Sequence, residues 1–158
     1  MRKYRILITS FFLLLLATGL YGESDDQPKW NTTLFESFFL DGGGAFGIGG
    51  AVGYSFISQL ELEGEVYYMF TGRHDYYGMS AAFISTFDIG SNHIFPYILG
   101  GVSLFGESWA EYTYLMWGGG MKWHMDIKKS YKIRFDSRFY LGEGGLWMKF
   151  SIGLMWTF

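Results

Sequence analysis

Charged side chains occupy alternate positions in two short stretches of this 158-residue chain. The first stretch is ELEGE at 61–65, and the second is KIRFDSR at 132–138. Residues at every second position lie on one face of a β-strand. If both stretches are extended, one has an acidic face and the other a mainly basic face. Such faces can pair with each other, or they can act on a charged solute that passes between them.

A glycine pattern near residue 45 resembles a nucleotide site but lacks its context. Gly42, Gly44 and Gly47 match G-x-G-x-x-G, and Glu61 follows at a suitable distance. That motif needs a helix that begins at the glycines, whereas strand-like alternation follows them here. Bends and close backbone packing explain these glycines better. We expect no cofactor.

The three histidines do not form a recognisable site. His74 lies in an expected loop, His93 lies in a turn at the other end, and His124 lies on an inward face near Asp126. A catalytic base must lie within hydrogen-bond reach of its nucleophile, and the spacing does not match a metal site. We therefore expect neither catalysis nor a bound metal.

Composition favours a single all-β domain. Aromatic residues make up 22% of the chain, Gly occurs 23 times and Pro only twice. Aromatic residues suit pleated sheets, and repeated Gly weakens helices. The absence of cysteine excludes disulfides, thiolate metal sites and a lipid-modified cysteine.

The first residues have the layout of a secretory signal peptide. Arg2, Lys3 and Arg5 precede an apolar run over 6–16, which is shorter than the ~20 residues of a membrane-spanning helix. We expect a signal peptide at 1–22, an exposed tail at 23–29 and one folded domain at 30–158. Nine basic and 15 acidic residues remain after residue 22, so nucleic acid is not an expected partner.

Polar or glycine-bearing breaks recur about every dozen residues after Trp30 and delimit eight segments. Each segment has about 9 to 15 residues, close to the ~9–11 that a tilted transmembrane strand requires. Over 59–70, apolar residues and Gly64 alternate strictly with a face that carries three glutamates. The segments over 34–40 and 94–105 alternate less clearly. For these we expect Leu34, Glu36, Phe38, Tyr97, Leu99 and Ser103 to face inward.

The large apolar side chains are too numerous for a small interior, and the opposite faces carry glycines and charges. This pattern predicts an inverted arrangement with apolar residues toward lipid. The expected fold is an eight-stranded antiparallel up-and-down transmembrane β-barrel with both ends on the periplasmic side. A soluble exported ligand-binding barrel is the alternative with the opposite orientation of faces.

Four segments resemble the small outer-membrane β-barrel family that includes the OmpA transmembrane domain and OmpX. They are FPYILGGVSLFG at 95–106, GGGMKWHM at 118–125, IRFDSRFY at 133–140 and the terminal GLMWTF. The resemblance implies a monomer in the bacterial outer membrane, with outer-membrane lipids and the barrel assembly machinery as partners. It also implies a C-terminal assembly signal that comprises Ile152, Leu154, Trp156 and Phe158. The expected outward loops are shorter than in many relatives, which speaks against a loop-based adhesin.

In an eight-stranded barrel, the third and seventh strands lie opposite each other. We therefore expect a network of charges inside the barrel that comprises Glu61, Glu63, Glu65, Lys122, Lys132, Arg134, Asp136, Arg138 and Lys149. Eight strands leave an interior that side chains just fill, so the network is expected to plug the lumen. The expected function is structural support of the membrane without catalysis. The alternative is a narrow passive channel for small solutes or apolar compounds.

Overall fold

The computed structural model describes residues 29–40, 44–71, 75–90, 93–107, 110–128, 130–142 and 145–158. The predicted signal peptide, most of the predicted tail and His74 lie outside these residues. The described residues form eight strands: β1 (Lys29–Leu40), β2 (Ala45–Ile57), β3 (Leu60–Phe70), β4 (Asp75–Thr86), β5 (Ile94–Glu107), β6 (Ala110–Lys128), β7 (Tyr131–Gly142) and β8 (Gly145–Thr157).

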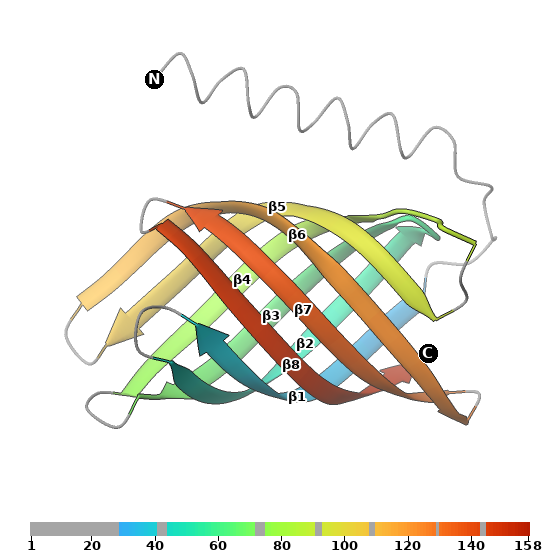
Figure 1. The fold of residues 1–158 in the computed structure, drawn as a ribbon, viewed down its shortest axis with the longest axis horizontal. Coiled ribbons are helices and arrows are strands. Elements are labelled where there is room, and N and C mark those ends of the chain that lie inside the picture. Colours follow the sequence, from blue (N-terminus) through green and yellow to red (C-terminus); the bar gives the residue numbers. More distant parts are fainter. Residues whose placement is uncertain are drawn as a thin grey trace, which may run out of the picture.

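The strands form a closed antiparallel barrel in chain order, as Figure 1 shows. Each strand pairs with the next, and β1 pairs with β8 from Asn31–Thr157 to Leu40–Met148. The backbone N–H of Phe158 also donates to the carbonyl of Trp30, at 2.9 Å. Closure leaves no open sheet edge, which a sheet in lipid requires. The predicted fold class is confirmed.

No helix in the described part of the chain has the length and apolar character needed to cross a membrane.

The longest strand exceeds the predicted range. β6 has 19 residues, and its pairing with β5 continues to Glu107 and Ala110. The sequence indicated a break over 106–110 because Gly106 and the polar residues after it are typical of turns. The two strands are separated inside this predicted break, but β5 continues to Glu107 and β6 already begins at Ala110. Polar residues are tolerated at a strand end that extends beyond the apolar band.

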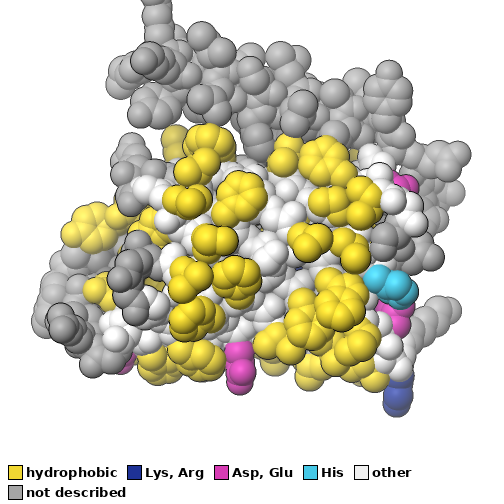
Figure 2. All heavy atoms as spheres, in the orientation of Figure 1, with side chains coloured by type: hydrophobic (Ala, Val, Ile, Leu, Met, Phe, Trp, Pro, Cys, Tyr) yellow, Lys and Arg dark blue, Asp and Glu magenta, His cyan; other side chains and the backbone are white. Residues whose placement is uncertain are grey.

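The outer surface of the barrel is apolar. Leu115 is 64% exposed, and other large apolar side chains on all eight strands are exposed as well. Figure 2 shows hydrophobic side chains over the middle of one face, with the visible charged side chains at the edges of the view. The charged residues Glu63, Arg138 and Lys149 are instead buried inside. The predicted reversal of polarity is therefore present.

The predicted orientation of β1 is wrong. Leu34, Glu36 and Phe38 point outward, whereas Thr33, Phe35, Ser37 and Phe39 are buried in the lumen. Pairing fixes the orientation, because Leu34 lies opposite the outward Leu154 of β8. A shift of one residue reverses every side chain of a strand, and both faces of β1 mix apolar and polar residues.

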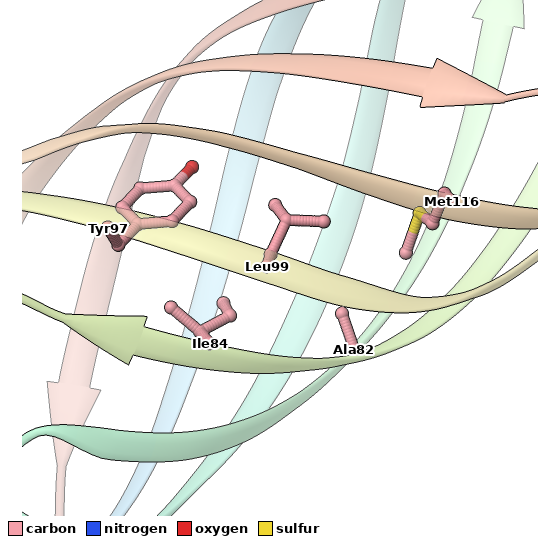
Figure 3. Close-up of a cluster of buried hydrophobic side chains, with 5 residues drawn as sticks. All are labelled: Ala82, Ile84, Tyr97, Leu99 and Met116. Carbon is pink, nitrogen blue, oxygen red and sulfur yellow. The ribbon is translucent and has the colours of Figure 1, made fainter. Parts of the chain in front are cut away.

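One side of the lumen is an apolar cluster. Ala82 and Ile84 of β4, Tyr97 and Leu99 of β5, and Met116 of β6 project into the barrel from three adjacent strands (Figure 3). Leu99 and Ile84 are fully buried. The predicted inward orientation of Tyr97 and Leu99 is confirmed.

The backbone of β4 approaches β5 closely at Gly101, which pairs with Ala82 and Met116. A Cβ on Gly101 would collide with backbone atoms of Ala81 and Ala82. Gly64 on the outer face has open space, with its nearest such atom at 3.9 Å.

We expect Gly101→Ala to lower the free energy of unfolding by about 1–3 kcal/mol, because strands must shift to admit the methyl group. The matched variant Gly64→Ala should change it by less than about 0.5 kcal/mol. Urea unfolding in detergent micelles measures both. Equal effects of the two substitutions would contradict the close approach at Gly101.

Candidate functional site

Two opposite strands supply most of the charged side chains in the lumen. β3 carries Glu61, Glu63 and Glu65, and β7 carries Arg134 and Arg138, all on inward faces. The two strands are four positions apart in a ring of eight, so these side chains extend toward each other across the lumen. The alternation seen in the sequence thus places an acidic wall opposite a basic one.

Glu63 lies at the centre of the network. Its carboxylate is 2.6 Å from Nη1 of Arg134, 2.9 Å from Nη2 of Arg138 and 3.6 Å from Nζ of Lys122. Only 1% of the Glu63 side chain is exposed. Three cations therefore surround one buried carboxylate, and they come from two neighbouring strands, β6 and β7.

Asp136 links the two arginines of β7. Its Oδ2 atom accepts hydrogen bonds from Nη2 of Arg134 at 2.6 Å and from Nη2 of Arg138 at 2.5 Å. Tyr97 donates its hydroxyl to Oδ1 of Asp136 at 2.6 Å and accepts from Nε of Arg138 at 2.9 Å. Tyr97 was absent from the predicted network. Its inward position in the 95–106 segment was the available signal.

Further ion pairs lie on either side of Glu63 along β3, at Glu65 and at Glu61. Glu65 accepts hydrogen bonds from Nζ of Lys149 at 2.9 Å and lies 3.2 Å from Nη1 of Arg138. Lys149 also lies 4.2 Å above the ring centre of Phe35. Glu61 pairs with Lys122 at 2.8 Å. Its other oxygen accepts from Asn31, at 2.7 Å.

The network is balanced in formal charge. It joins four acids to four bases: Glu61, Glu63, Glu65, Asp136, Lys122, Arg134, Arg138 and Lys149. A buried charge without a partner costs several kcal/mol, and pairing with hydrogen bonds offsets that cost. The arrangement crosses the lumen from β3 to β7.

Lys132 does not join this network, although the alternation in the sequence predicted that it would. Its Nζ atom lies 3.1 Å from Oδ1 of Asp126, and the two side chains are 30% and 55% exposed. Lys132 is the second residue of β7 and pairs with Asp126 next to the turn that contains Ser130. It lies at the end of the barrel, two positions from Arg134, and solvent reaches it there.

Another part of the lumen contains a cavity of about 70 Å³ that is lined mainly by aromatic side chains. They are Phe39, Tyr67, Phe105, Tyr114, Tyr140 and Trp147, and two methionines and two serines complete the lining. That volume is less than the 150 Å³ of an engineered cavity that binds benzene. The described lumen therefore holds ion pairs at one level and a small cavity with an aromatic lining at another.

Two of the three histidines, His93 and His124, lie in the described part of the chain, where the backbone N–H of His124 donates to the carbonyl of His93 at 2.8 Å. The ring of His124 packs on Phe95, with centroids 5.0 Å apart. No group of three potential ligands among the described residues is placed to hold a metal ion.

The residues of the expected C-terminal signal lie at the end of β8. Ile152 and Leu154 are outward and exposed, and Trp156 contacts Tyr131 edge to face, with centroids 6.1 Å apart. Phe158 lies just past the strand and is 78% exposed. Its side chain is therefore accessible, while its backbone N–H bonds to β1.

We expect Arg138→Ala to lower the free energy of unfolding by about 3–5 kcal/mol, because it leaves the four carboxylates of the buried network with only three cations. The control Lys132→Ala breaks an exposed pair and should cost less than about 1 kcal/mol. Urea titration of the protein refolded into lipid vesicles measures both. A cost for Arg138→Ala no larger than that for Lys132→Ala would show that the network does not stabilise the barrel.

No protein-family model matches the chain, and no curated protein sequence matches it. Solved structures do match. The N-terminal β-barrel domain of Pseudomonas aeruginosa OprF aligns with a TM-score of 0.63 at 17% identity, over 84% of this chain and 100% of that one. Neisserial surface protein A aligns with a TM-score of 0.61 at 14% identity, over 83% and 97%.

Ail, the attachment invasion locus protein of Yersinia pestis, was solved in complex with a heparin analogue. It aligns with a TM-score of 0.54 at 14% identity, over 84% of this chain and 100% of that one. At identities this low, the structural alignments establish a shared architecture and nothing finer. The resemblance stated from the sequence is confirmed at that level: the chain has the eight-stranded fold of the small outer-membrane barrels.

Proposed function

We propose that this protein is an integral protein of the bacterial outer membrane that supports membrane structure and has a closed lumen. The observation that carries the proposal is the charge-balanced network across the barrel, centred on Glu63. The side chains of this network occupy the lumen, and each charged group is paired with a group of opposite charge. A channel that passes ions needs sites that bind weakly enough to release them.

The outer surface supports a position in lipid. Exposed apolar side chains cover all eight strands, and aromatic pairs such as Trp30–Tyr54 and Tyr131–Trp156 lie near one end of the barrel. Aromatic residues at the ends of an apolar band are typical of membrane interfaces. The paired ends of β1 and β8 would lie on the periplasmic side. A cleaved signal peptide at 1–22 would direct export.

The closed lumen can be tested by conductance in planar bilayers. We expect the unmodified barrel to give no steady current. The double variant Glu63→Ser/Arg138→Ser removes one large side chain of each sign and should produce reproducible single-channel steps. Lys132→Ser, which alters an exposed pair outside the network, should remain silent.

Reproducible steps of single-channel current from the unmodified protein would overturn the proposal of a closed lumen and favour the narrow channel. Heat-modifiable migration on gels shows that each variant is folded, because a folded barrel and an unfolded chain migrate differently.

A second test concerns the assembly machinery as a partner. Phe158 is exposed, so Phe158→Ala removes little packing and leaves its backbone bond to Trp30 in place. We expect unchanged refolding into synthetic vesicles but a severalfold lower amount of folded barrel in cells. Fractionation with heat-modifiable migration measures the second quantity. An equal loss in both settings would show that Phe158 acts through stability instead.

A further inference from the structure

Glu36 is a charged residue on the wrong face of a membrane barrel. It points outward from β1, between the exposed Leu34 and Phe38. Among described side chains, it is the one charged group that points outward from the interior of a strand; Asp75, the first residue of β4, lies at a strand end. A charged residue within the hydrocarbon is costly, so its presence points to a function.

The position of Glu36 along the barrel lies within the apolar band. It is six residues from Trp30, which at ~3.3 Å per residue and a tilt near 40° corresponds to about 15 Å along the membrane normal. It is four residues from Leu40, or about 10 Å by the same conversion. The apolar band of such barrels is about 25 Å tall, so neither water layer lies within reach of a short glutamate side chain.

The surroundings of Glu36 within the chain offer no polar partner. Across the strand pairs it lies opposite Ile48 of β2 and Ile152 of β8. Within the described residues, no hydrogen bond or ion pair involves its carboxyl group. The next outward position on β2 is Gly50, which has no side chain and lies opposite Leu34. This part of the outer surface is therefore apolar, has no projecting side chain at Gly50 and carries one carboxyl group.

We propose that the outer face of β1 is the interface of a symmetric homodimer in the membrane, in which the two Glu36 carboxyl groups hydrogen-bond to each other. A twofold interface brings each residue near the axis against its own copy, so the group at the axis must be self-complementary. A protonated carboxyl group donates to, and accepts from, a second carboxyl group. A pair that keeps at least one proton therefore satisfies both side chains.

A second copy fits this surface better than lipid does. Lipid tails offer no hydrogen-bond partner, while apolar residues such as Leu34 and Ile152 contact lipid or protein with similar energy. Association in a bilayer thus depends on polar pairs and on close approach of the two backbones. Gly50 permits such a close approach because it has no side chain. Among described residues, no cation on the outer face away from the strand ends could pair with Glu36 of another copy, which favours the carboxyl pair.

The dimer departs from the monomer expected from the sequence, which rested on a family resemblance. It does not depend on whether the lumen is closed. A dimer could form around a conducting barrel, and a plugged barrel could be monomeric. The conductance experiment and the dimer experiment can therefore refute their proposals independently of each other.

Spin labels can test the interface because the chain has no cysteine. Val52→Cys places one nitroxide on β2 beside β1, and Val102→Cys places one on β5 at the opposite side of the barrel. Both valines point outward with similar exposure, 46% and 41%. Each labelled full-length barrel is reconstituted at low density in phosphatidylcholine vesicles, and distances between copies are measured by pulsed electron paramagnetic resonance.

We expect a defined interlabel distance for Val52→Cys and a distance longer by about two barrel widths, or none in range, for Val102→Cys. Adding Glu36→Leu should lower the association constant about tenfold and remove the defined distance. Adding Glu36→Gln should preserve it, because two amides also pair with each other. Heat-modifiable migration confirms folding of every variant.

The proposal is overturned by the absence of a defined distance at Val52 in the otherwise unmodified barrel. It is also overturned if Glu36→Leu leaves that distance in place, or if the Val102 labels are the closer pair. The first outcome would indicate that lipid or a different protein covers Glu36.

Discussion

The burial of Glu63 among three cations is the interaction on which the interior depends. An eight-stranded ring has a narrow lumen, so the side chains that point into it must satisfy one another without bulk water. Arg134 and Arg138 do this for Glu63 from the opposite wall. Asp136 then holds the two guanidinium groups in place from their own strand. The ion pairs therefore join strands that no backbone hydrogen bond connects.

Tyr97 connects the ionic and apolar parts of the lumen. Its ring belongs to the cluster on β4, β5 and β6, while its hydroxyl bonds to Asp136 and Arg138. Gly120 on β6 makes room for it, because a Cβ there would collide with the Tyr97 ring and hydroxyl. A missing side chain on one strand thus allows a large one on its neighbour to reach the network.

The sequence predicted the fold well where alternation was strong. The glutamates of β3 and the charged residues of β7 lie at alternate positions along their strands. So many charges cannot face lipid, so the alternation predicted which face of each strand points inward, and with it the barrel topology. The prediction failed on β1, where the pairing of Leu34 with Leu154 rules out the predicted inward orientation of Leu34, Glu36 and Phe38. Alternation is weak in this strand because both of its faces mix apolar and polar residues.

The limits at the site have a similar physical origin. Parity places Lys132 on the same face as Arg134, but parity carries no information about depth, and Lys132 lies at the end of the barrel beside Asp126. Tyr97 was foreseen as inward but not as a partner of Asp136, because that contact joins residues 39 apart in sequence. Partners across a lumen depend on register around the whole ring, which local patterns do not reveal.

The seam between β1 and β8 has a consequence for chain connectivity. These strands are adjacent and bonded along their length, so a short peptide joining residue 158 to residue 29 would bridge neighbouring positions at one rim. The chain could then be opened at a different hairpin, as circular permutation requires. Such a permutant would keep every strand pair and every lumen contact, while the aromatic terminus would become an internal turn. The architecture and the proposed recognition of the chain end would then become separable properties.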